Sequence, residues 1–97
     1  MTQIDVECRP DRDGWHCRVR LTDDQGTGEH LVRVARADLD RLAPGAADPE
    51  DLVRRSFEFL LAREPRTSIL REFDLPMIGR YFPEYETSIQ RSTEERP

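Results

Sequence analysis

Lysine and asparagine are missing from this 97-residue sequence, and cysteine and histidine occur only twice each. All 15 basic residues are therefore arginines. Selection for planar, bidentate guanidinium contacts would produce this bias, and so would the codon usage of a GC-rich genome. The simultaneous absence of asparagine favours codon usage, and it also excludes N-glycosylation.

The sequence has no apolar run near the roughly 18–20 residues that a membrane-spanning helix needs. Residues 1–10 alternate charged and apolar side chains and lack the apolar centre of a signal peptide. We therefore expect a cytoplasmic protein that does not contact membranes. Two cysteines are too few for a disulfide framework. The net charge of −5 argues against sequence-blind binding to nucleic acid or to anionic lipid.

Apolar residues make up 36% of the chain, and charged residues also make up 36%. This composition is polar, but the apolar residues recur with clear periods, which indicates a folded domain. The length allows one domain. We predict a single α+β domain over residues 1–85 and a frayed or disordered C-terminal tail over residues 86–97.

Two segments, residues 3–9 and 15–21, alternate strictly and are separated by turn chemistry at residues 10–14. An antiparallel register in which opposed residue numbers sum to 25 aligns every apolar and every charged pair. The pairs are Ile4 with Leu21, Val6 with Val19, Cys8 with Cys17, Asp5 with Arg20, and Glu7 with Arg18. A slip of one residue would set apolar side chains against charged ones, so this register is strongly favoured.

After a second turn at residues 23–28, residues 30–34 alternate as a third strand. The period then changes to that of helices. Asp38 is predicted to cap a short helix, Asp48 to cap the helix that covers the sheet over Leu52–Leu61, and Thr67 or Ser68 to cap a third helix. The predicted fold is thus a three-stranded antiparallel β-meander at the N-terminus, covered on one face by C-terminal helices.

Three segments of the helical half resemble a group of small uncharacterised bacterial proteins. They are DLDRLAPG (residues 38–45), FLLAREPRTSIL (residues 59–70) and FDLPMIGRYFPEY (residues 73–85). The resemblance implies a bacterial, cytoplasmic protein. It implies no catalytic or binding residue, because no activity is attached to that group.

Cys8 and Cys17 are neighbours in the predicted hairpin. They are interpreted as two small core thiols in a reducing cytosol, or alternatively as a redox pair that forms a cross-strand disulfide. Two thiolates without two further ligands do not make a zinc site, so we expect no metal and no cofactor. His16 and His30 lack the paired nucleophile and carboxylate of a catalytic triad, so we expect no enzyme activity.

Two surfaces are candidate partner contacts. Arg18, Arg20 and Arg33 share the outer face of the predicted sheet, which is either a solvated face or a docking face for an acidic protein or nucleic acid. Tyr81 and Tyr85 belong to an aromatic cluster that either closes the core or contacts a partner, since tyrosine is favoured at interfaces.

These observations favour a non-enzymatic protein-interaction module that binds a protein partner or a second copy of itself. The alternative is a small regulator that binds nucleic acid through the arginine-bearing sheet face, although the negative net charge speaks against nucleic acid. A second alternative is an enzyme whose site is not visible in the sequence.

Overall fold

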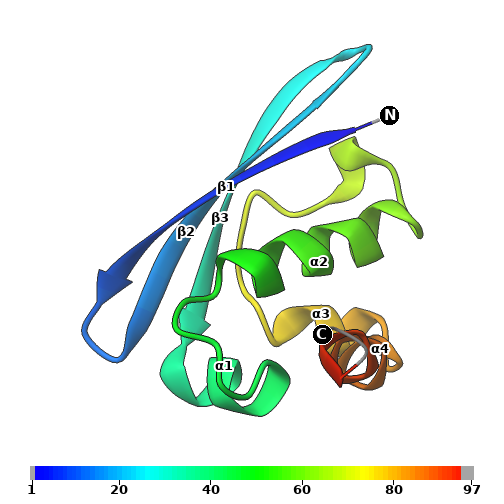
Figure 1. The fold of residues 1–97 in the computed structure, drawn as a ribbon. Helices are drawn as coiled ribbons and strands as arrows, with labels where there is room; N and C mark the ends of the chain where they lie inside the picture. Colours follow the sequence, from blue (N-terminus) through cyan, green and yellow to red (C-terminus); the bar gives the residue numbers. More distant parts are fainter. Residues whose placement is uncertain (1, 95–97) are drawn as a thin grey trace.

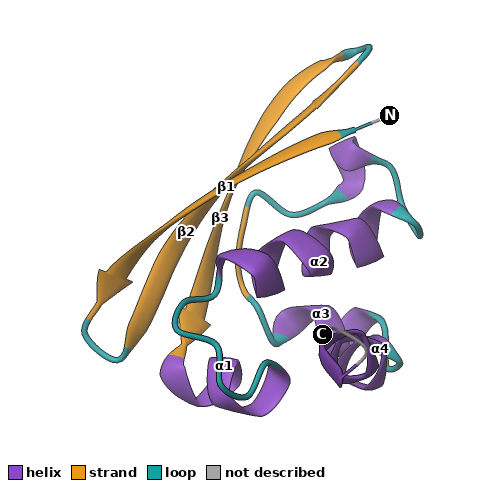
Figure 2. Ribbon diagram, viewed as in Figure 1, coloured by secondary structure: helices purple, strands orange, loops and turns teal. Residues whose placement is uncertain are grey.

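The computed structural model describes residues 2–94, in which four strands form one open sheet in the order β1-β2-β3-β4 (Figures 1 and 2). The fold is α+β. In chain order the elements are β1 (Gln3–Asp11), β2 (Gly14–Asp23), β3 (Gly26–Ala35), α1 (Arg36–Leu42), α2 (Glu50–Leu61), the 3-10 turn η1 (Arg66–Ser68), β4 (Glu72–Asp74), α3 (Met77–Tyr81) and α4 (Tyr85–Glu94).

The predicted hairpin register is confirmed, because Ile4 lies opposite Leu21, Val6 opposite Val19 and Cys8 opposite Cys17. The hairpin turns through two residues only, and the first of them, Arg12, has a positive φ of 49°. At Gly14 a Cβ atom would lie 2.2 Å from the Val34 carbonyl oxygen, so glycine is required where β2 begins beside β3. The turn and this close approach fix where the hairpin begins and ends.

The prediction of a three-stranded, wholly antiparallel sheet is wrong, because residues 72–74 form a fourth strand parallel to β3. This segment lies where a third helix was expected after Thr67 or Ser68. The Leu31 amide donates to the Arg71 carbonyl at 2.7 Å, and the Leu75 amide donates to the Arg33 carbonyl at 2.9 Å. Pairing with the exposed edge of β3 therefore satisfies backbone groups that a helix would have left on that edge.

One face of the sheet is apolar, and α2 lies along it while α1, α3 and α4 gather at one end (Figure 1). The alternation along the strands places the buried side chains on this inner face. They are Trp15, Cys17, Val19, Leu21, His30, Val32 and Val34. The predicted covering helix is confirmed, since α2 buries Leu52, Val53, Phe57 and Leu60 in the same core.

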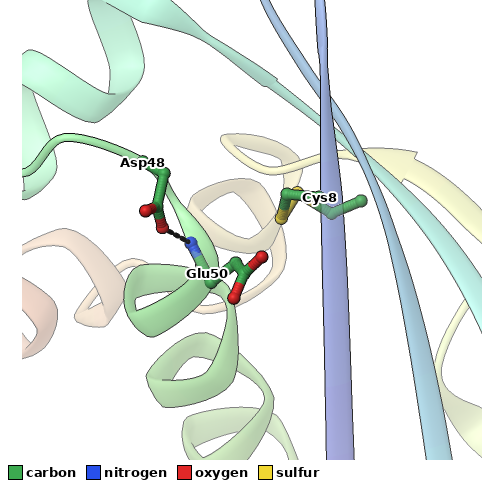
Figure 3. Close-up of a disulfide and its surroundings, with 4 residues drawn as sticks. Cys8, Asp48 and Glu50 are labelled. Carbon is green, nitrogen blue, oxygen red and sulfur yellow. Dashed lines mark hydrogen bonds between the residues drawn. A yellow bond between two sulfur atoms is a disulfide. The ribbon is translucent and has the colours of Figure 1, made fainter.

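The starts of the first two helices differ from each other. Helix α1 begins at Arg36, so Asp38 lies inside its first turn and is not its cap. The N-cap of α2 is Pro49, one residue after the predicted cap Asp48, although the Asp48 carboxylate accepts the Glu50 amide at 3.0 Å (Figure 3). Asp51 then accepts a hydrogen bond from the Arg55 Nε at 2.9 Å, one helical turn away.

The structure also corrects the expected tail, because residues 85–94 form helix α4. Tyr85 and Ile89 are buried on the core side of α4, and Arg41 donates to Glu86 at 2.6 Å. The rest of the predicted tail, residues 95–97, lies outside the described residues. Within residues 2–94, no helix combines the length and apolarity needed to cross a bilayer.

Candidate functional site

An apolar groove of about 350 Å³ opens between the end of α2, the segment around β4, and α3. Most of its walls are aliphatic or aromatic, and Glu64 and Ser68 are the polar residues that line it. The apolar lining residues are Leu60, Ile69, Leu70, Phe73, Met77, Ile78, Tyr81 and Phe82. We refer to this cavity as the β4 groove.

Ring contacts from the core hold the floor of the β4 groove in place. Phe73 packs against Phe57 of α2 with ring centroids 6.0 Å apart, and Phe82 meets Phe59 edge-on at 5.8 Å. Such tilted and edge-on arrangements are the favourable geometries for aromatic pairs. The groove is therefore built on packed core residues, and a ligand would meet a preformed surface.

His30 fixes one side of the groove from the inner face of β3. Its Nδ1 donates to the Leu70 carbonyl oxygen at 2.7 Å, since a carbonyl can only accept. The ring is buried against Phe57, and its Nε2 has no hydrogen-bond partner among the described residues. His30 thus positions the backbone at Leu70.

Two groove residues expose large apolar side chains to water. The Leu70 side chain is 46% exposed and Tyr81 is 66% exposed. Most large apolar residues of the described chain are buried in the core cluster. Because Leu70 and Tyr81 are both exposed at the same cavity, they form a distinct apolar surface. Tyr81 therefore does not close the core, although Phe82 beside it is partly buried there.

The free edge of β4 runs beside this groove. Residues 71, 73 and 75 direct their backbone groups toward β3, as the Leu31–Arg71 and Leu75–Arg33 hydrogen bonds show. Because these directions alternate along a strand, the amides and carbonyls of Glu72 and Asp74 point away from the sheet. Both side chains are exposed, and neither forms an ion pair within residues 2–94.

The opposite edge of the sheet, β1, is obstructed near its two ends. The Arg54 guanidinium of α2 donates to the Ile4 carbonyl, and Pro10 has no amide hydrogen to offer. Arginine contacts and prolines at an edge strand block the addition of another strand. Of the two edges, β4 is the one that adjoins the apolar groove.

Tyr85 does not contribute to a partner surface, which corrects one of the predicted contacts. Its side chain is fully buried, and its hydroxyl lies 2.6 Å from the Ser56 Oγ. Burial raises the pKa of Tyr85 well above its usual value. The aromatic cluster is thus divided, with Tyr85 in the core and Tyr81 on the groove.

Arg18, Arg20 and Arg33 lie exposed on the outer sheet face, as predicted. Arg18 pairs at 3.6 Å with Glu29, whereas the register had suggested Glu7. Arg20 lines a polar hollow that also contains Asp5 and Glu29. Carboxylates from two strands thus interrupt the positive charge of this face.

The sulfur atoms of Cys8 and Cys17 are joined as a disulfide, and their Cα atoms are 4.0 Å apart. The disulfide projects from β1 toward the start of α2, near Asp48 of the preceding loop and Glu50 of the helix (Figure 3). Cys17 is buried and Cys8 is partly buried. The structure thus contains the oxidised form of the pair, and its reversible reduction stays a prediction.

The two histidines lie on opposite faces of the sheet. His16 faces outward and pairs with Asp11 at 2.6 Å, on the opposite face from His30. Across residues 2–94, no group of three or more such side chains could hold a metal ion.

The fold and the groove define the class of this protein as a small α+β domain with an open mixed sheet and an apolar groove beside its β4 edge. The chain matches no protein-family model, no curated protein and no solved structure. The resemblance of its helical half therefore stays a prediction, and the functional argument rests on the groove.

Proposed function

We propose that this protein is a non-enzymatic interaction module that binds a segment of a partner protein in the β4 groove. The observation that supports this most strongly is the exposure of Leu70 and Tyr81 at a preformed apolar cavity. Burial of apolar surface contributes about 25 cal/mol per Å², and tyrosine is enriched at interfaces. The open β4 edge adds backbone donors and acceptors beside the apolar surface.

The chemistry of the groove supports binding better than catalysis. Its polar lining consists of Glu64 and Ser68, without a histidine, cysteine or second carboxylate. Acid–base catalysis uses paired titratable groups whose pKa values are pushed apart, and nucleophilic catalysis uses an activated nucleophile. The cavity offers a partner mainly shape and apolar area.

Nucleic-acid binding through Arg18, Arg20 and Arg33 has weaker support. Glu29 neutralises Arg18, Asp5 lies beside Arg20, and the net charge is −5. Phosphate contacts provide most of the affinity of sequence-blind binding, so interleaved carboxylates oppose it. A protein segment is the ligand that the described surface favours.

A peptide-display library selected on the immobilised protein tests the proposal. The selected peptides are then titrated against Leu70→Asp with Tyr81→Asp, which changes two exposed side chains of the groove. We expect binding at least about tenfold weaker, since removal of one central contact commonly changes affinity by that factor or more.

Leu31→Thr is the control, because Leu31 is 48% exposed on the outer face and does not line the groove, and because a neutral residue adds no charge opposite Glu72. It should change the affinity by less than about twofold. Equal binding to the wild type and the double groove variant, with unchanged melting temperatures, would rule out the groove as the interaction site.

A further inference from the structure

We infer that the ligand of the β4 groove is an extended peptide that adds as a strand to β4 and alternates apolar with basic residues. This inference rests on the proposed function and specifies its partner. It follows from three properties of the β4 edge, which are its free backbone groups, the face on which the groove lies, and the unpaired carboxylates on the other face.

The backbone groups favour a strand over a helix. The amides and carbonyls of Glu72 and Asp74 point away from β3, so they are free to bond with an added chain. A peptide in this position would become a fifth strand, as in other cases of β-augmentation. An amphipathic helix in the groove would leave these four backbone groups unpaired.

The two faces of β4 then determine the side chains of the added strand. Phe73 faces the core and lines the groove, so every second side chain of an added strand would point to the same apolar side. The remaining side chains would lie beside the exposed carboxylates of Glu72 and Asp74. Opposite charges on neighbouring strands attract, so arginine or lysine is favoured at those positions, most strongly beside Glu72, since Asp74 already lies opposite Arg33 of β3.

A second copy of this chain does not satisfy the same edge. Two copies could pair antiparallel through the free groups of β4 in three registers. Centred on Phe73, Glu72 would lie opposite Asp74 of the other copy. Centred on Glu72 or on Asp74, that carboxylate would lie opposite the same residue of the other copy. Like charges directly opposed on adjacent strands are destabilising. The edge therefore favours a different chain that is positively charged. The net charge of −5 on this protein would attract such a chain as well.

The probe is a capped seven-residue peptide in which arginine and valine alternate, titrated against the intact protein by fluorescence polarisation and amide NMR. We expect saturable binding, with shifts at the Glu72 and Asp74 amides, that weakens as salt rises. The same peptide with glutamate in place of arginine should bind at least about tenfold more weakly. A peptide of identical composition with the valines and arginines in separate blocks should also bind more weakly.

Two N-methylated probes test strand geometry. In an extended peptide the valine amides point to one edge and the arginine amides to the other. Methylating one set should abolish binding, while methylating the other set should leave it within about twofold. Equal effects of the two methylated probes would overturn the strand assignment.

A charge-reversed protein completes the test. Glu72→Arg with Asp74→Arg changes two exposed side chains, and it should reverse the preference between the basic and acidic probes. An unchanged preference in this variant, with an unchanged melting temperature, would refute the charge assignment.

The two proposals fail differently. In one outcome, library peptides bind with an affinity that depends on the groove residues but not on the alternation, charge or N-methylation of the peptide. That result would overturn the strand inference and leave the interaction module intact. Groove-independent binding of every library peptide would instead overturn the proposed function.

Discussion

Ser56 and Tyr85 form a buried chain of hydrogen bonds between α2 and α4. The Ser56 hydroxyl donates to the Leu52 carbonyl at 2.8 Å, so its oxygen accepts from the Tyr85 hydroxyl at 2.6 Å. Because burial raises the pKa of Tyr85, the phenol keeps its proton and remains the donor. This pair joins the last helix to the core through one polar contact in an apolar environment.

Removing the Tyr85 hydroxyl and removing the Ser56 hydroxyl should lower the stability by different amounts. Tyr85→Phe loses one hydrogen bond and should lower the free energy of unfolding by about 1 kcal/mol. Ser56→Ala leaves the buried phenol without an acceptor and should lower it by about 1–3 kcal/mol. Urea unfolding of both variants measures the order, and a Tyr85→Phe variant clearly less stable than Ser56→Ala would contradict the donor assignment.

Asp23 links the β2–β3 turn to η1. Its carboxylate accepts the Arg66 Nε at 3.0 Å and the Gln25 amide at 2.8 Å. The hydrogen bond from Arg66 is the main cause that lowers the pKa of Asp23 below its ordinary value of 3.8. A lowered folded-state pKa gives stability that is present above the unfolded value and is lost as the pH falls through the folded value.

Asp23→Asn should therefore lower the melting temperature at pH 7, and the difference from wild type should shrink as the pH falls below 3.8. Asp24→Asn, an exposed position in the same turn, is the control and should change little. Thermal melts across the acid range measure the effect. A difference that persists unchanged at the most acidic pH would show that the charge of Asp23 is not responsible.

Among the elements, the β1–β2 hairpin is closed by a disulfide that encloses a short loop. Cys8 and Cys17 are nine residues apart, for which the loss of loop entropy in the unfolded chain predicts about 2–3 kcal/mol of stabilisation. Reduction should lower the melting temperature, while the backbone register should survive because the apolar pairs on either side also hold it.

Mass spectrometry and thermal melts with and without a phosphine reductant test this prediction. The intact protein should gain two hydrogens on reduction and melt at a lower temperature. A Cys8→Ala variant, which cannot form the disulfide, should melt at a temperature that the reductant does not alter. Two free thiols in the oxidised preparation would contradict the expectation.

The elements differ in how far the sequence could predict them. The hairpin was predictable because apolar and charged pairs agree on one register. Strand β4 was not, because Ile69, Leu70 and Phe73 have helical spacing and the stabilising contact with β3 is remote in sequence. For α4, Tyr85 and Ile89 gave a signal at i and i+4, but the buried Ser56 hydroxyl that receives Tyr85 could not be foreseen.

The candidate site was predicted only in part. Tyr81 was named as a partner contact and lines the groove, whereas Leu70, Glu72 and Asp74 were missed. Residues 72–75 alternate charged and apolar side chains, which was the available signal for a strand. Four residues are too few to decide between a strand and a helical turn, so the open edge became visible only in the folded chain.

At the scale of the whole molecule, the two sheet edges are unequal. Arg54 and Pro10 obstruct the two ends of β1, while β4 presents free backbone groups flanked by carboxylates. Charge on an edge strand is one way in which proteins prevent edge-to-edge association. The same carboxylates would thus keep copies of this chain apart and attract a basic strand.

This double role predicts that one substitution converts the β4 edge into a self-association site. With Glu72→Arg, which lies opposite Leu31 on β3, two-fold pairing centred on Phe73 would set the new guanidinium of each copy opposite Asp74 of the other, replacing two repulsive pairs by two attractive ones. We expect the wild type to sediment as a monomer and the variant to associate with increasing concentration, most strongly at low salt. Glu72→Gln removes the repulsion without adding attraction, so its association should lie between the two. A variant that sediments like the wild type at every concentration would show that charge is not what keeps the β4 edges apart.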